Sequence, residues 1–302
     1  MSASLVNLDK QSASAASAIG HNRLCNVEDF ADPRLRDVIR DVFDHEIDRL
    51  GADFPRGREY RKYWEVAMAV RALVDYGVAH QEAEVLGVGA GNEPTLFWLT
   101  NHVRRVFATD IYADESAWNE SSHASMLVDP GAHWPFVWNP RRLVVQHMNG
   151  LDLKYEDNTF DGVFSSSSIE HFGTLDDVAR AAAEICRVLR PGGVASISTE
   201  FLLEGPRMGW EGCLMFDLET LRRRIIDPLP WSLVSPLDTA ISPATLAAEV
   251  PFDEAAGDVA RHVAQRGCLV FHKLTFTSYP SIVLRKGDLL WTSVHLCLRK
   301  DA

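Results

Sequence analysis

Hydrophobic and polar positions change their spacing several times along this chain, and each change predicts an element. Apolar residues recur at helical spacing over 33–50 and over Arg58–Tyr76, and each segment ends at a glycine. Spacing of three to four residues places apolar side chains on one face, so both segments are predicted to be amphipathic helices. Part of the second helix must pack on a sheet. The aromatic and cationic residues of its first turns, Tyr60 and Arg61 among them, can instead cover a ligand site.

Short apolar runs predict strands that alternate with further helices. The predicted strands are 83–88, 105–110, 142–148, 159–164 and 194–199, and the helices between them are 95–104 and 175–189. This alternation predicts an α/β fold with an open parallel sheet covered on both faces. The final segment, 289–299, alternates apolar and polar residues and is predicted to be an edge strand.

A glycine-rich turn joins the strand 83–88 to its helix. Its glycines permit positive φ and let a ligand lie against bare main chain, while Pro94 suits the first helical position and makes Glu93 the N-cap. The free N–H groups and the positive end of the helix dipole then face the ligand. No Gly-Lys-Ser/Thr follows and no lysine is near, which indicates a ligand without phosphate. Several nucleotide-binding families share such a turn, the dinucleotide fingerprint fits poorly, and a turn without ligand is the alternative.

Asp110 ends the next predicted strand. At the carboxyl end of a neighbouring parallel strand, an acidic residue is placed to accept hydrogen bonds from ribose hydroxyls. The alternative is an aspartate that caps the following helix. The ribose interpretation is favoured because the glycine turn precedes it.

Composition narrows the class of protein. The chain has 302 residues, 46% hydrophobic and 24% charged, which is typical of a soluble globular protein. The net charge of −12 argues against nucleic acid as a partner. Scattered cysteines without a C-x-x-C pair predict reduced thiols, no metal centre and a cytoplasmic location. No run of 18 apolar residues and no signal peptide are visible, so no membrane contact is expected, and the oligomeric state is not predicted.

The chain is expected to have three parts. Residues 1–30 are predicted to be a disordered tail, because the first 22 residues are rich in serine and alanine. Residues 31–80 are predicted to form a helical cap, and 81–302 the main domain. Within that domain, 113–141 and 201–285 are expected to be insertions on the substrate side.

Four motifs occur in a fixed order: VLGVGAG at 85–91, TD at 109–110, NGLDLKYEDNTFDGVFSSSSIEH at 149–171, and RVLRPGG at 187–193. As a set they resemble the class I S-adenosylmethionine-dependent methyltransferases, especially the small-molecule branch called type 11. The resemblance implies a Rossmann-like, doubly wound, mostly parallel sheet with an antiparallel C-terminal edge strand. It also implies S-adenosylmethionine as cofactor and transfer of its methyl group to oxygen or nitrogen of a small molecule.

The resemblance also implies the cofactor contacts. The turn would hold the methionine end and Asp110 the ribose, with Ile111 or Tyr112 on the adenine face. The implied cofactor-binding residues are Gly87, Gly89, Ala90, Gly91, Asp110, Ile111, Asn149, Gly150, Leu151 and Ser165.

Two positions depart from the family pattern. The family usually has an acidic residue where Gly87 stands and glycine where Glu93 stands. One hypothesis is that Glu93 supplies the missing negative charge near the ammonium or sulfonium of the cofactor. The other is that Glu93 is an N-cap carboxylate favoured by the helix dipole.

Methyl transfer is an in-line displacement, and a hydroxyl or ammonium acceptor also needs a proton acceptor. Glu170 and His171, just after the strand 159–164, are the candidates, although His171 can instead cap a helix or stack on the cofactor. The acceptor is not identified by the sequence. Its pocket has four unranked candidates: Trp210, His272, Tyr279 and His295.

Two other functions remain open at this stage. One is a catalytically silent regulatory or scaffold protein that binds S-adenosylmethionine, and the other is a nicotinamide-dependent oxidoreductase.

Overall fold

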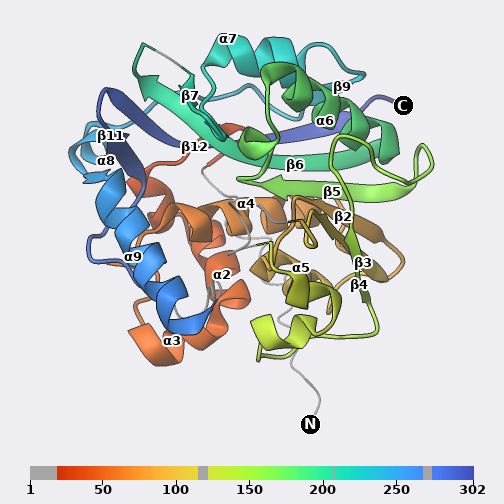
Figure 1. The fold of residues 1–302 in the computed structure, drawn as a ribbon, viewed down its shortest axis with the longest axis horizontal. Helices are drawn as coiled ribbons and strands as arrows, with labels where there is room; N and C mark the ends of the chain where they lie inside the picture. The colour runs from red at the N-terminus through yellow and green to blue at the C-terminus, as the bar shows by residue number, and fades with distance from the viewer. Residues whose placement is uncertain (1–18, 115–121, 207, 268–273) are drawn as a thin grey trace.

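A single mixed sheet forms the centre of the molecule (Figure 1). The computed structural model describes residues 19–114, 122–206, 208–267 and 274–302. The parallel strands are β2 (Glu84–Val88), β3 (Arg105–Asp110), β4 (Leu143–His147), β5 (Phe160–Ser166) and β6 (Leu189–Glu204). Strand β12 (Leu289–Lys300) runs antiparallel to β6. The remaining strands of this sheet are β1 (Arg23–Leu24), β9 (Trp231–Leu233), β10 (Glu249–Pro251) and β11 (Val283–Lys286).

Helices cover both faces of the sheet, as predicted (Figure 1). One face packs on α2 (Pro33–Val42), α4 (Arg61–Asp75) and α5 (Pro94–Leu99), and the other on α6 (Leu175–Val188) and α7 (Leu218–Leu221) with its π-helical extension η6 (Arg222–Ile226). Helix α6 begins with a capping box in which Thr174 and Asp177 satisfy each other's backbone N–H groups. Each sheet face therefore has its own apolar core.

Two predicted helices have different bounds. The segment 33–50 is broken at the buried Phe43, whose φ of −114° and ψ of 40° separate α2 from α3 (Asp44–Leu50). Helix α5 ends at Leu99, earlier than expected, and the hydroxyl of Thr100 donates to the Phe97 carbonyl at 2.6 Å. Side chains that bond the local backbone compete with further helical turns.

The C-terminal strand β12 is antiparallel, as predicted, but it is not a free edge. It pairs with β6 over most of its length and with β11, β9 and β1 on its other side. Its residues from Leu289 to Leu298 are all buried, so the alternation of residue types does not reflect one solvated face. The predicted turn 190–193 lies within β6 as an irregularity in the pairing with β5.

Residues 19–31 are an ordered part of the fold, whereas the predicted disordered tail extended to residue 30. Strand β1 pairs with β12, and the short helix η2 (Val27–Ala31) follows it. Asp29 on η2 is buried, accepts a 2.8 Å hydrogen bond from the Trp64 indole and pairs with Arg23 at 2.9 Å. Residues 1–18 lie outside the described part of the chain.

Both predicted insertions contain short elements. In the first, η3 (Ala124–Leu127) and η4 (Pro130–His133) are described, while 115–121 are not. The second contains β7 (Gly209–Trp210), β8 (Cys213–Leu214), α8 (Pro243–Ala247) and α9 (Phe252–Arg266), besides α7, η6, β9, β10 and β11. Strand β10 separates helices α8 and α9.

The strand order is β10-β11-β12-β6-β5-β2-β3-β4. The chain leaves β2 toward β3 and β4, then returns to β5 on the opposite side of β2. The carboxyl ends of β2 and β5 thus flank the point where the strand order reverses, which is where open α/β sheets bind ligands.

Candidate functional site

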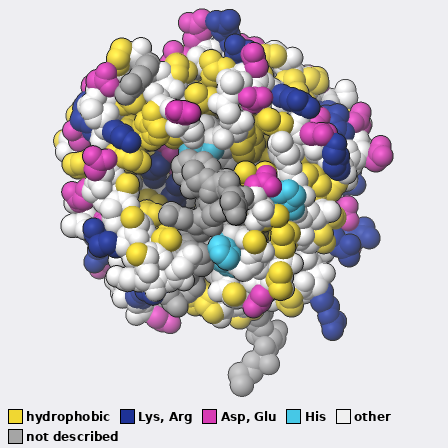
Figure 2. Space-filling model, viewed as in Figure 1, with side chains coloured by type: hydrophobic (Ala, Val, Ile, Leu, Met, Phe, Trp, Pro, Cys, Tyr) yellow, Lys and Arg dark blue, Asp and Glu magenta, His cyan; other side chains and the backbone are white. Residues whose placement is uncertain are grey.

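A cavity of about 630 Å³ opens at the carboxyl ends of the parallel strands. This volume lies within the usual range for small-molecule sites. Its polar half is lined by the turn after β2, the end of β3, residues 148–151 after β4, and residues 166–168 at the end of β5. The face drawn in Figure 2 is hollowed near its centre, and hydrophobic side chains border the hollow.

The glycine turn after β2 is tightly held. Gly89 and Gly91 have φ of 62° and 48°, which favour glycine. A Cβ on Gly89 would lie 2.6 Å from the Cβ of Ser168, whose hydroxyl donates to the Gly89 carbonyl at 2.6 Å. The phenol of Tyr112 donates to the Gly91 carbonyl, also at 2.6 Å. The turn is therefore a preformed, bare stretch of cavity wall.

Asp110 links this turn to the end of β3. Its Oδ2 accepts from the N–H of Gly91 at 2.8 Å and its Oδ1 from the N–H of Ile111 at 2.7 Å. Burial raises the pKa of the Asp110 carboxyl above its ordinary value. A carboxylate has about four acceptor positions, so capacity for ligand hydroxyls remains.

The segment after β4 forms the facing wall. Asn149, Gly150 and Leu151 all line the cavity, as does Ile111. Asn149 accepts the N–H of Leu151 on Oδ1 at 2.9 Å, and this turn positions its amide. A Cβ on Gly150 would lie 2.9 Å from the ring of Phe172, so a side chain there would require a shift.

The predicted cofactor residues Gly87 and Ser165 lie outside the described lining. Ser165 is buried within β5, and the cavity is reached by the residues that follow it, Ser166 to Ser168. Alternation along a strand places neighbouring side chains on opposite sides. A Cβ on Gly87 would lie 2.7 Å from the ring of Phe164, so that ring occupies the space an acidic side chain would need.

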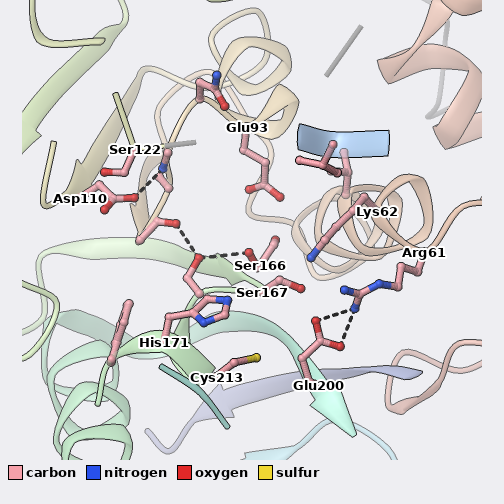
Figure 3. Close-up of a pocket in the computed structure, with 18 of the residues that line it drawn as sticks. Arg61, Lys62, Glu93, Asp110, Ser122, Ser166, Ser167, His171, Glu200 and Cys213 are labelled. Atoms are coloured by element: carbon pink, nitrogen blue, oxygen red, sulfur yellow. Dashed lines mark hydrogen bonds and ion pairs between the residues drawn. The ribbon is translucent and has the colours of Figure 1, made fainter. Parts of the chain in front are cut away.

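Glu93 occupies the N-cap position of α5, as predicted, but its side chain does not cap the helix. It lines the cavity, and Figure 3 shows the carboxyl extending from the start of α5 toward the centre. The surrounding protein shields it from water, and together with the negative charge of Glu65 this raises its pKa to about 8. The N-cap carboxylate hypothesis is therefore wrong for the side chain.

Helix α4 contributes two cations to the lining. Arg61 donates to Glu200 at 2.6 Å (Figure 3). Lys62 donates to the fully buried Glu65 at 2.9 Å. The hydroxyl of Ser167 also donates to Glu65, at 2.8 Å. Each cation thus has a buried carboxylate partner, which such burial requires.

The two candidate catalytic residues differ in position. His171 lines the cavity; its Nδ1 contacts the Gly212 carbonyl at 2.8 Å, and burial lowers its pKa to about 4. Glu170 is fully buried outside the described lining and accepts from the Thr199 hydroxyl at 2.8 Å. Burial, with the nearby charge of Glu200, raises the pKa of Glu170 to about 8. A base works best with a pKa near the working pH, so a neutral, weakly basic His171 is poorly suited to that role.

Of the substrate-side candidates, Trp210 lines the cavity. Tyr279 is outside the described lining, and His295 is buried at β6–β12, where its Nε2 lies 2.8 Å from the hydroxyl of Ser196. His272 lies outside the described residues.

Sequence reasoning missed Lys62, Glu65 and Glu200. Their spacing resembles that of any charged helix or strand end, and only the packing of α4 against β6 brings them together. The one available signal was the cationic first turn of α4, already noted at Tyr60 and Arg61, which both line the cavity.

Among the residues that the structure describes, no helix is long and apolar enough to cross a bilayer. The same residues contain no group of three histidine, cysteine or acidic side chains that could hold a metal ion. The described cysteines, Cys25, Cys186, Cys213 and Cys297, are free and buried.

Comparison with known proteins places part of the chain in a family. The family described as "Methyltransferase domain" (type 11) matches residues 86–197. The O-methyltransferase rstn1 of Aspergillus nomiae is 40% identical over 57 residues, which cover 19% of this chain and 24% of that protein. The match thus spans about a quarter of that relative's length.

Two solved methyltransferase structures are similar to this chain at low sequence identity, and the first of them shares its fold. A protein assigned as a sarcosine dimethylglycine methyltransferase from Galdieria sulphuraria is 15% identical, with a TM-score of 0.50 over 78% of this chain and 85% of that one. Phosphoethanolamine N-methyltransferase 2 of Haemonchus contortus, solved with S-adenosyl-L-methionine, is 15% identical, with a TM-score of 0.46 over 89% of this chain and 60% of that one. Residues 86–197 thus match the methyltransferase domain family, and the ordered motifs and the sheet topology agree with that match.

Proposed function

We propose that this protein binds S-adenosylmethionine in the polar half of the cavity and transfers its methyl group to a small-molecule acceptor. The observation that carries the proposal is the pairing of Asp110 with the bare turn at Gly91, at the point where the strand order reverses. This pairing places a hydrogen-bond-accepting carboxylate beside an exposed stretch of main chain, and that stretch carries no lysine that could bind phosphate.

The residues present fit this cofactor. Gly89, Ala90 and Gly91 would hold the methionine end, Asp110 the ribose diol, and Asn149 to Leu151 the adenine; each of these residues lines the cavity. Gly87 and Ser165 would contribute indirectly, because they shape the turn and the end of β5 without lining the cavity.

Glu93 would replace the acidic residue that the family has at the position of Gly87. Phe164 fills the space beside Gly87, whereas the carboxyl of Glu93 reaches the cavity from the other end of the same turn. The cofactor carries a sulfonium and an ammonium, and an opposite charge nearby favours the ionised carboxylate. The negative charge would therefore be moved within the turn rather than lost.

The bound cofactor supplies an electrophilic methyl group. The contribution of the chain is to orient the acceptor along the methyl–sulfur bond and to exclude water, which together supply much of the rate in a bimolecular displacement. Tyr60, Lys62 and His171 also line the cavity, and the acceptor would lie against them.

Calorimetric titration of the purified chain with S-adenosylhomocysteine, the demethylated product, tests the proposal. We expect micromolar binding by the wild type, a loss of about ten-fold or more in Asp110→Ala, and no binding of NADH. Transfer of labelled methyl groups to a metabolite extract would then separate an enzyme from a silent cofactor-binding protein. Retention of NADH but not S-adenosylhomocysteine would contradict the proposal in favour of an oxidoreductase.

A further inference from the structure

The cavity continues beyond the polar half into a second half, whose residues lie outside the four sequence motifs. Its wall comes from β7, α9, β11 and β12, and α9 lies at the same end of the molecule as β11 (Figure 1). The principal lining side chains are Trp210, Phe252, Ala256, Phe276, Leu284 and Trp291. Among the described lining residues after position 200, none is charged.

Three aromatic rings form one continuous apolar surface there. The ring centroids of Trp210 and Trp291 are 5.6 Å apart, those of Trp210 and Phe252 5.3 Å, and those of Phe252 and Trp291 5.5 Å. Lys286 holds its ammonium 4.4 Å from the ring centre of Trp210 and 4.8 Å from that of Phe252. Such contacts fix amphipathic rings in place, so the surface is preformed rather than assembled from mobile side chains.

Helix α9 presents small side chains to the same space. Ala255, Ala256, Val259 and Ala260 line it along successive turns of the helix. Side chains of this size leave room that leucine or phenylalanine would fill. These small side chains therefore leave space beside the aromatic rings within the cavity of about 630 Å³.

The charges at the junction of the two halves are balanced. Arg61 is paired with Glu200 and Lys62 with Glu65, and these two are the lysine and arginine side chains among the described lining residues. Because a buried carboxylate already neutralises each cation, an acceptor carboxylate or phosphate would lose its hydration without a compensating gain in net electrostatic attraction.

From the aromatic surface, the small residues of α9 and the paired cations, we propose that this second half binds the methyl acceptor, and that the acceptor is an uncharged, largely apolar, ring-bearing alcohol or phenol. The inference rests on the proposed function and specifies its substrate class. The ring would lie against Trp210 and Trp291, and the hydroxyl would point toward Glu93 and Lys62. An oxygen lone pair forms the new bond to the methyl carbon, the sulfur keeps the electron pair of the broken bond, and the hydroxyl proton passes to water.

Two probes with the same naphthol ring system test this class. 2-Naphthol is titrated into the chain saturated with S-adenosylhomocysteine, and 6-hydroxy-2-naphthoate, which adds one carboxylate, is titrated in parallel. We expect 2-naphthol to bind at least about ten-fold more tightly, because the carboxylate loses its hydration without gaining a free cation. Equal or tighter binding of the naphthoate overturns the proposal.

A matched pair of variants locates the probe. Ala256→Phe fills the pocket, while Ala264→Phe adds the same ring to the exposed side of α9. Ala256→Phe should weaken 2-naphthol at least about ten-fold, through lost apolar burial, and change S-adenosylhomocysteine affinity less than about two-fold. Ala264→Phe should change neither affinity, and unaltered naphthol binding in Ala256→Phe overturns the assignment. Should the wild type not bind S-adenosylhomocysteine, the proposed cofactor is refuted, and the same naphthol titrations on the cofactor-free chain decide the pocket separately.

Discussion

The carboxylate of Asp110 accepts a hydrogen bond from the backbone N–H of Gly91 at 2.8 Å, which fixes the end of β3 to the turn after β2. The same carboxylate accepts from the N–H of Ile111, so it is oriented from both sides. A carboxyl group held in this way loses little conformational entropy when it accepts further hydrogen bonds from a ligand. Asp110 therefore has two functions, one in the turn and one toward the proposed ribose.

The two functions of Asp110 can be separated by a thermodynamic cycle in which both the ligand and residue 110 are changed. S-adenosylhomocysteine and its 2′-deoxyribose analogue are titrated into wild type and Asp110→Ala. We expect the analogue to bind the wild type about ten-fold more weakly, because hydrogen bonds to charged groups contribute about 1.5–3 kcal/mol. In Asp110→Ala both ligands should bind weakly and almost equally. An unchanged preference for the full ribose in the variant would show that Asp110 acts on the turn alone.

Glu93 should couple cofactor binding to pH. Its pKa of about 8 means that most molecules carry a protonated Glu93 at neutral pH, and a cationic ligand requires the ionised form. The affinity for S-adenosylmethionine should therefore rise between pH 5.5 and 7, by up to about ten-fold per pH unit. Glu93→Gln should bind more weakly and lose this dependence, as measured by calorimetry.

The exposed Glu82 provides the control, since Glu82→Gln should behave as the wild type. S-adenosylhomocysteine lacks the sulfonium but keeps the ammonium, so a larger effect of Glu93→Gln on S-adenosylmethionine than on the product would place the carboxyl near the sulfonium. Wild-type affinity that is constant over this pH range would remove Glu93 from the site.

The His171 imidazole should remain neutral at pH values well below the ordinary pKa of histidine. Burial lowers its pKa to about 4, and its Nδ1 lies 2.8 Å from the Gly212 carbonyl, which favours a proton on Nδ1. Nitrogen-15 NMR of labelled histidines, with the signal assigned through His171→Gln, should show the Nδ1-protonated tautomer between pH 5 and 8. A midpoint near 6.5 for His171 would restore it as a candidate base.

Local patterns predicted the parts of the fold that local chemistry determines. The bounds of β3 are those expected, and α6 begins and ends within one residue of its prediction, because apolar periodicity and the Thr174 capping box act within a few residues. Strand β1 could not be predicted in this way. It is two residues long and pairs Arg23 with His295, at the opposite end of the chain.

The residues of the candidate site likewise divide into those that local sequence patterns predicted and those that they did not. The turn at Gly89–Gly91 and Asp110 were found from sequence because their chemistry follows from their place after a strand. Whether an acidic side chain fits at position 87 depends on what fills the space beside Gly87, and that is the ring of Phe164, more than seventy positions further along the chain. The apolar pocket likewise depends on the packing of α9 beside β12, which no periodicity specifies.

Glu170 should make the stability of the cofactor-free chain depend on pH. In the folded chain burial raises its pKa from 4.5 to about 8, so the folded state holds its proton more tightly than the unfolded state does. The associated stabilisation is fully present below about pH 4.5 and is lost as the pH rises toward about 8, because the unfolded chain ionises freely.

Glu170→Gln keeps an amide oxygen for the Thr199 hydroxyl and removes the charge. We therefore expect the variant to match the wild type near pH 4.5 and to have a free energy of unfolding higher by roughly 1–3 kcal/mol at pH 8, measured by urea denaturation. Glu211→Gln, at an exposed position, should show no such difference. An equal gain for Glu170→Gln at both pH values would mean that packing, and not the ionisation of this carboxyl, distinguishes the two proteins.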